Sequence, residues 1–413
     1  MTEKTGKIRS GLLGLPGNVV LLGIVSLFAD ISSEMVNPIV PLFLASVLTA
    51  SPEIIGLIMG GADSLANLLK VFVGWYSDRV SRRKPFVAFG YAPVAFVRPL
   101  LAFATSWWHV LGIRLADRAG KGIRTAPRDA LIIDSVGTDR RGAAFGLHRA
   151  MDTAGAIIGT AIAILLVAIG LGTDQTDDMR MLFLLSAIPA VISVLIVIFF
   201  VRERRERTGQ EGSKATLGFV SSLRAVDPKL KRFLVVVVFI GLANVGYTFF
   251  VLRAHDFGAG LMEVLVAYLL MNITYTLFSY PSGSVSDRVG RKKMLMLGML
   301  VFVAASMTIA LSDSLVMVFL GFLIYGTFLA IVDVNQGAFA SMLSRTTDRG
   351  TVMGAFHTVS GLTALPAGVI FGLIWSNVGM IFAFGYASVI AIFAFFLLWW
   401  FVRESEELRT STT

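Results

Sequence analysis

The chain has 413 residues, of which 55% are hydrophobic and only 15% are charged. A soluble domain carries about 25% charged residues, so this composition excludes a water-soluble globular protein and indicates an integral membrane protein. The formal net charge of +9 would suggest nucleic-acid binding in a soluble protein. Here we expect the cations to set orientation in the membrane, with no nucleic-acid partner. The chain has no cysteine, which excludes disulfides and thiolate metal sites.

Apolar segments long enough to cross a bilayer recur along the chain. A helix of about 20 apolar residues spans the hydrocarbon core. By this measure the predicted spans are 18–48, 53–77, 85–106, 108–128, 142–171, 179–201, 232–254, 262–284, 293–312, 315–342, 351–376 and 379–402. The fourth carries so many charges that a strict hydropathy count could miss it. We therefore predict an all-α integral membrane protein of about twelve transmembrane helices.

The loops alternate in charge, which predicts the orientation. One set contains the cations Arg79, Arg82, Arg83, Lys84, Arg140, Arg141, Arg202, Arg204, Arg205, Arg207, Arg288, Arg291, Lys292, Lys293, Arg345 and Arg349. The other set contains the acids Asp174, Asp177, Asp178, Asp256 and Asp313. Cationic loops stay on the cytoplasmic side. Both termini are also basic, so both are predicted to be cytoplasmic, in a multi-pass protein of the cell (inner) membrane.

Two motifs repeat at nearly the same offset, which indicates an internal duplication. Residues 74–84 resemble residues 283–293 at an offset of 209, and residues 141–146 resemble residues 349–354 at an offset of 208. Between the copies lies a polar, basic stretch at 202–231, which reads as a cytoplasmic linker that can contact lipid headgroups. We predict two six-helix bundles, at 1–201 and 232–413. Parallel repeats of this kind are typical of transporters with a site between the halves.

The repeated motif carries a family resemblance. Its pattern, G-x-x-x-D-R-x-G-R-R/K-R/K, resembles the signature of the major facilitator superfamily, with Ser81 at the second glycine in the first copy. The resemblance covers essentially the whole chain and implies that superfamily's fold and alternating-access transport. We expect a cytoplasmic gate in which acids at helix ends pair with nearby cations, formed by Gly74, Asp78, Arg79, Arg82, Gly283, Asp287, Arg288 and Arg291. The alternative is that the basic residues are only topology signals.

The fourth and fifth spans extend this resemblance but depart from it. Residues 114–122 are similar to the family pattern R-x-x-Q-G-x-G-x-G, whose arginine is associated with proton coupling, but Asp117, Arg118 and Lys121 depart from it. The antiporter pattern G-x-x-x-G-P survives only as residues 155–160, with Thr160 in place of proline. Symport and antiport therefore both stay open. The string at 117–132 resembles that of a bacterial branch of the superfamily.

Charges inside the membrane are costly and are usually functional. A carboxylate removed from water takes up a proton more readily, so the candidates for proton coupling are Asp30, Glu34, Asp63, Asp152 and Asp333. Candidates for the substrate cavity are Arg114, Asp117, Arg118, Arg149, Asn244, Tyr247, Asn272, Tyr275, Asn335 and Gln336. In the alternative interpretation, these ions pair within the first bundle, for example Asp117 with Lys121 and Asp63 with Lys70, and the neutral groups join helices. The resemblance implies that spans three, six, nine and twelve are outer helices that face lipid, and Arg98 is the only charge in their cores.

The sequence predicts a transporter rather than an enzyme. It contains no G-x-x-x-x-G-K-[ST] loop for ATP, and its four histidines lack metal-ligand spacing, so we expect no cofactor and no metal. We predict proton-coupled transport of a small solute by a monomer, with efflux of a small organic or drug-like metabolite favoured. The alternatives are an anionic metabolite or siderophore, suggested by the excess of cations in span four, and a membrane receptor.

Overall fold

The computed structural model describes residues 14–80, 82–137, 140–170, 172–203, 227–343 and 349–402, with the side chains of Asp78, Arg349 and Gly350 outside the described part. Within these ranges the elements are helices, in agreement with the predicted class. Most of the predicted linker, residues 204–226, lies outside them, and helix α10 already begins at Pro228. The division at 1–201, 202–231 and 232–413 therefore stays a prediction.

The helices follow the predicted spans closely in both halves. The first half contains α1 (Gly17–Val36), α2 (Ile39–Ser46), α3 (Pro52–Val80), α4 (Lys84–Val97), the 3₁₀ helix η2 (Pro99–Phe103), α5 (Trp107–Asp134), α6 (Arg141–Ala168), α7 (Gln175–Leu185) and α8 (Ala187–Phe199). The second half contains α10 (Pro228–Ala243), α11 (Thr248–Asp256), α12 (Leu261–Val289), α13 (Arg291–Ala310), α14 (Leu315–Met342), α15 (Arg349–Asn377) and α16 (Met380–Phe401).

Eleven helical segments in the described part of the chain are long and apolar enough to cross a membrane. Helix α5 is long enough, at 28 residues, but is not one of them. Its middle carries Arg114, Asp117, Arg118, Lys121 and Arg124. It corresponds to the fourth predicted span, the one that a strict hydropathy count was expected to miss.

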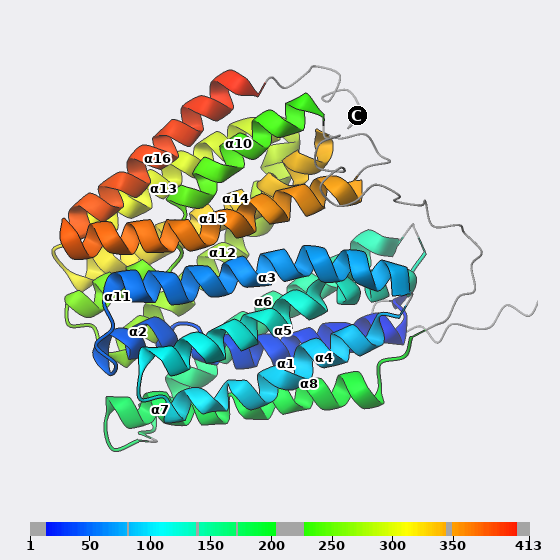
Figure 1. Ribbon diagram of the computed structural model, residues 1–413, viewed down its shortest axis with the longest axis horizontal. Helices are drawn as coiled ribbons and strands as arrows, with labels where there is room; N and C mark the ends of the chain where they lie inside the picture. Colours follow the sequence, from blue (N-terminus) through cyan, green and yellow to red (C-terminus); the bar gives the residue numbers. More distant parts are fainter. Residues whose placement is uncertain are drawn as a thin grey trace, which may run out of the picture.

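Figure 1 shows the helices side by side in two groups, α1–α8 and α10–α16, with α3 and α15 lying along each other between the groups. Glycines permit this contact. A Cβ atom on Gly56 of α3 would lie 2.1 Å from the carbonyl oxygen of Gly368 on α15. Small residues are what lets two membrane helices approach this closely. Helix α6 also packs against α12, and α2 against α11, as further contacts between the groups.

Two helices are broken at matching positions of the repeat, where the sequence predicted continuous spans at 18–48 and 232–254. The first break, at Asn37 and Pro38, separates α1 from α2. The second separates α10 from α11 at residues 244–247, where Gly246 has a φ of +73°. Proline lacks the donor that would continue a helix, and glycine adopts positive φ readily. In transporters, interrupted helices at corresponding positions point to the binding site.

The two ends of the bundle differ. At the end that we call the linker end, α8 ends and α10 begins; α2, α7 and α11 lie at the opposite, distal end (Figure 1). The outer helices mostly behave as expected, since α8 and α16 expose large apolar side chains such as Ile198 and Phe396. Arg98, directly after α4, is the exception: its side chain is buried and points into the first half.

Candidate functional site

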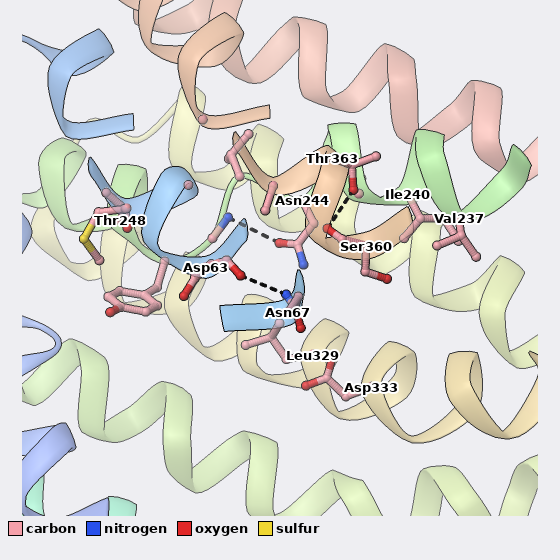
Figure 2. A pocket seen from close by; sticks show the side chains of 18 of the residues that line it. Asp63, Asn67, Val237, Ile240, Asn244, Thr248, Leu329, Asp333, Ser360 and Thr363 are labelled. Atoms are coloured by element: carbon pink, nitrogen blue, oxygen red, sulfur yellow. Dashed lines mark hydrogen bonds between the residues drawn. The ribbon is translucent and has the colours of Figure 1, made fainter. Parts of the chain in front are cut away.

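A cavity of about 480 Å³ lies between the two halves, beside the break in α10–α11. Helix α3 supplies its wall from the first half, and α10, α11, α14, α15 and the segment at 244–247 supply the rest. Figure 2 shows Asp63 and Asn67 on α3, Asp333 on α14 and Asn244 at the break around this space. The volume suits a small organic molecule, since ligand pockets typically measure about 300–1,000 Å³.

Two carboxylates line the cavity, one from each half. Asp63 is 54% exposed and pairs with Arg118, whose Nε lies 3.4 Å from its Oδ1. Asp333 is exposed to the cavity and makes no hydrogen bond or ion pair with any described residue. Among the described residues, no lysine or arginine lines the cavity. Both acids were predicted as coupling candidates, and the structure brings these two together.

Neutral polar groups complete the wall. The side-chain oxygen of Asn244 accepts hydrogen bonds from the hydroxyl of Tyr325 at 2.8 Å and from the backbone N–H of Gly246 at 3.3 Å. Tyr247 and Gln336, two of the candidates for the substrate cavity, also line this cavity. His357, which the sequence did not single out as a cavity residue, lines it too.

A chain of polar contacts runs from Asp63 to the other half. Arg118 donates to the side-chain oxygen of Asn37 at 3.3 Å, and the Asn37 amide donates to Glu34 at 2.9 Å. The hydroxyl of Tyr268, on α12, donates to the second oxygen of Glu34 at 2.6 Å. The helix break at Asn37 thus connects a cavity carboxylate to a contact between the halves. Sequence reasoning missed Asn37, although an Asn-Pro pair is a recognisable turn signal.

A second cluster, formed by Arg98, Arg114 and Asp117, is buried within the first half. Arg98 Nε lies 2.8 Å from Asp117 Oδ1, and Arg114 Nη1 lies 3.5 Å from Asp117 Oδ2. Arg98 also donates to the hydroxyls of Ser32 and Ser33 on α1. Arg114 and Asp117 were predicted for the cavity, but neither lines it, and Arg118 reaches it only through Asp63. Asp117 therefore pairs with arginines rather than with Lys121.

Asp30 and Asp152 lie in a third polar region, between α1 and α6, and do not line the cavity. Asp152 Oδ2 lies 3.3 Å from Nδ1 of His148, whose Nε2 lies 3.0 Å from the hydroxyl of Ser26. Asp30 has no hydrogen bond or ion pair with a described residue, and its Cβ faces Gly155 of α6. Glu34 contacts Tyr268 and does not line the cavity either. Three of the predicted coupling acids, Asp30, Glu34 and Asp152, thus lie away from the cavity.

The remaining cavity candidates lie elsewhere in the described part of the chain. Arg149 of α6 donates to the hydroxyl of Tyr275 of α12, which joins the two halves. Asn335 donates to Ser282 at 2.9 Å and joins α14 to α12 within the second half. Asn272 is buried. For Asn335 the structure agrees with the alternative interpretation of helix–helix hydrogen bonding.

The predicted gate residues lie at the linker end, and the side chain of Asp78 is outside the described residues. A Cβ on Gly74 would come within 3.0 Å of Ala126, whereas one on Gly283 would meet only Val334, at 3.5 Å. Only the first glycine is therefore required for close packing. Asp287 pairs with Arg291 of its own half at 3.3 Å, while Arg79 stacks on Trp75 and Arg82 and Arg288 are exposed.

Comparison with known proteins agrees with this architecture. The family model of the Major Facilitator Superfamily matches the chain twice, at residues 22–273 and 233–413. An uncharacterized MFS-type transporter of Methanocaldococcus jannaschii is 36% identical over 93% of this chain and 94% of its own. Among solved structures, a mutant of the nucleoside transporter NupG superposes with a TM-score of 0.78 at 16% identity, covering 94% of this chain and 100% of that one.

A transporter of the POT family, solved with 5-aminolevulinic acid, also superposes with a TM-score of 0.78, at 13% identity, covering 95% of this chain and 97% of that one. At such low identity these structures show the fold alone. The family match and the relative go further: they imply a multi-pass membrane protein that carries a small-molecule solute and is not an enzyme. The chain belongs to the Major Facilitator Superfamily of membrane transporters.

Proposed function

We propose that the chain is a secondary active transporter that moves a small organic solute across the cell membrane by alternating access, with the cavity between its halves as the binding site. The observation that carries this proposal is the position of the cavity, beside a helix break and between one carboxylate from each half. In this proposal α5, the fourth span, also crosses the membrane and brings the number of spans to twelve. The linker end is cytoplasmic, because cationic loops stay on that side.

The contacts between the halves support a state that is closed at the distal end. There, the hydroxyl of Tyr268 binds Glu34, that of Tyr247 donates to the backbone oxygen of Asn37 at 3.2 Å, and Ser376 donates to Glu53. At the linker end, Asp287 pairs within its own half. Closing this end would bring the gate residues of the two halves together. Rocking between these arrangements is the movement that alternating access requires.

Transport is proposed to be coupled to protons, with efflux as the favoured direction. Asp30 supports this, because it is a carboxylate in the span region with no described ion-pair partner. Asp152, Lys121 and Glu34 are among the charges that act on it. An acid that is not neutralised by a partner in a low-dielectric region is suited to exchange a proton. An anionic solute loses support, because the arginines that suggested it do not line the cavity.

The test is transport by purified protein in proteoliposomes loaded with a pH-sensitive dye. Candidate solutes come from a thermal-shift screen across solute classes. We expect a stabilising solute to move protons when it is added, and a pH gradient to drive its accumulation. Solute flux that ignores the pH gradient would refute proton coupling. A failure of every stabilising solute to cross would refute transport through this cavity.

A further inference from the structure

The charge on the cavity wall points to the class of solute. Asp63 and Asp333 both face the cavity, and no lysine or arginine among the described residues lines it. His357 is the remaining titratable lining side chain besides tyrosine, and its Nε2 lies 3.1 Å from Nζ of Lys70, which does not line the cavity. A solute in this space therefore meets two carboxylates.

Neither carboxylate is fully satisfied by the protein. Arg118 contacts Oδ1 of Asp63 at 3.4 Å, and Asp63 remains 54% exposed. Asp333 has no hydrogen bond or ion pair with a described residue. Arg149 acts on Asp333 electrostatically but donates its hydrogen bond to Tyr275. An ionised carboxylate at membrane depth has a high free energy without a partner. Asp333 is therefore expected to bind a proton or a cationic group.

The rest of the wall suits an organic body. Met59, Leu329, Phe249 and Phe356 supply apolar surface. The oxygen of Asn244 is held by Tyr325 and Gly246, which leaves its NH₂ group for the cavity. Pockets for small molecules commonly combine such apolar walls with a few polar groups that set orientation.

We propose that the cavity binds a small organic cation, an amine with an apolar body, whose ammonium group pairs with Asp333 and is attracted by Asp63. This inference rests on the proposed transport function and names its substrate class. The two carboxylates belong to different halves, so they repel each other when the halves close around an empty cavity. A bound cation removes that repulsion and thereby favours closure.

The experiment compares three probes that share a phenyl body and differ in charge: 2-phenylethylamine, 2-phenylethanol and 3-phenylpropionate. Each is added at millimolar concentration to purified full-length protein, and the thermal unfolding temperature is recorded. We expect the amine to raise this temperature and the other two probes to leave it unchanged. Stabilisation by the carboxylate, or by the alcohol as strongly as by the amine, overturns the proposal, as does the absence of any shift.

Variants assign the effect to the cavity. Removing the charge in Asp333→Asn should weaken amine binding about ten- to hundredfold, as expected for a lost charge-assisted hydrogen bond. Asp333→Glu should retain most of it, which guards against a folding defect. Asp313→Asn makes the same change at an exposed acid between α13 and α14 and should bind like the parent protein. Amine binding that survives in both Asp333→Asn and Asp63→Asn overturns the assignment.

Transport assays distinguish a failure of this inference from a failure of the proposed function on which it rests. Because the neutral form of each probe also crosses a bilayer unaided, every flux is taken as the excess over protein-free liposomes. An excess accumulation of the amine in a pH gradient supports both. An excess for the neutral or anionic probe, with none for the amine, overturns the cation site and leaves transport in place. If the amine binds through Asp333 but no probe shows an excess, the proposed function fails while the site stands.

Discussion

In the first half, Arg98, Asp117 and Arg114 form a buried ion cluster, whereas in the second half neutral groups such as Asn335 and Ser282 join the helices. The ion cluster fixes α1, α4 and α5 to one another through directional contacts. The second half supplies most of the cavity wall. This difference teaches that intramembrane charge need not line a substrate path: the three charges of this cluster hold one half together, while the other half provides most of the binding surface.

The largest expected effect is on thermal stability, and it tests this difference between the two halves. Replacing Asp117 with alanine leaves two buried arginines without their acid, and breaking a buried ion pair typically costs about 3–5 kcal/mol. Replacing Asn335 with alanine removes neutral hydrogen bonds and should cost about 1–3 kcal/mol. Thermal unfolding in detergent should therefore show a much larger drop for Asp117→Ala. Equal drops would remove the distinction between the halves.

The next prediction concerns the contact that joins the halves. Gly56→Ala would place a methyl group 2.1 Å from the Gly368 carbonyl oxygen, so α3 and α15 must separate, at a cost of about 1–3 kcal/mol. Transport should fall sharply, because the cavity wall shifts with α3. Gly61→Ala is the matched control, since its Cβ would meet only Leu365, at 3.6 Å. If both variants behave like the parent protein, the glycines do not set this contact.

The architecture was predictable because long apolar segments and repeated motifs are properties of local sequence. The ion-pair partners were harder to predict from the sequence, because hydropathy does not say which way a side chain points around a helix axis. Arg98 lies in a span that was expected to face lipid, and the alternative interpretation offered Lys121 as a partner for Asp117, whereas the structure pairs Asp117 with Arg98. The break at Asn37 was missed because the apolar run continues through Pro38, and an apolar count does not register a missing backbone donor.

Two acids in different regions should also have separable roles. Asp30→Asn should abolish accumulation driven by a pH gradient and still permit downhill exchange, because the amide cannot exchange a proton but leaves the rocking of the halves possible. Glu34→Gln should have a milder effect or shift the pH optimum. Paired uptake and exchange assays measure both. If Asp30→Asn keeps full proton-driven transport with an unchanged pH profile, coupling must instead be sought at Asp63, Asp152 or Asp333.

Substitutions in the predicted gate should have a smaller effect, which is confined to the rate of transport. Asp78→Asn and Asp287→Asn should slow transport several-fold, because pairs at the linker end would form only when that end closes. Folding and membrane insertion should stay intact, since Asp287 is an exposed residue that pairs with Arg291 next to it. Exchange rates and expression levels test this. Normal transport by both variants would leave the basic residues as topology signals alone.

The smallest expected effect concerns the distal contact between a charged group of the first half and a neutral group of the second. Tyr268→Phe removes the hydroxyl that donates to Glu34 at 2.6 Å and keeps the ring in edge-to-face contact with Tyr247. A hydrogen bond to a charged acceptor contributes about 1.5–3 kcal/mol. Its loss should therefore lower the free energy needed to open the distal end by part of that amount. We expect labels placed at the distal ends of α2 and α11 to report a larger open population. Tyr247→Phe is the comparison, because its hydroxyl meets only a neutral backbone oxygen and should shift the population less. The reverse order would mean that the charge on Glu34 does not strengthen this contact.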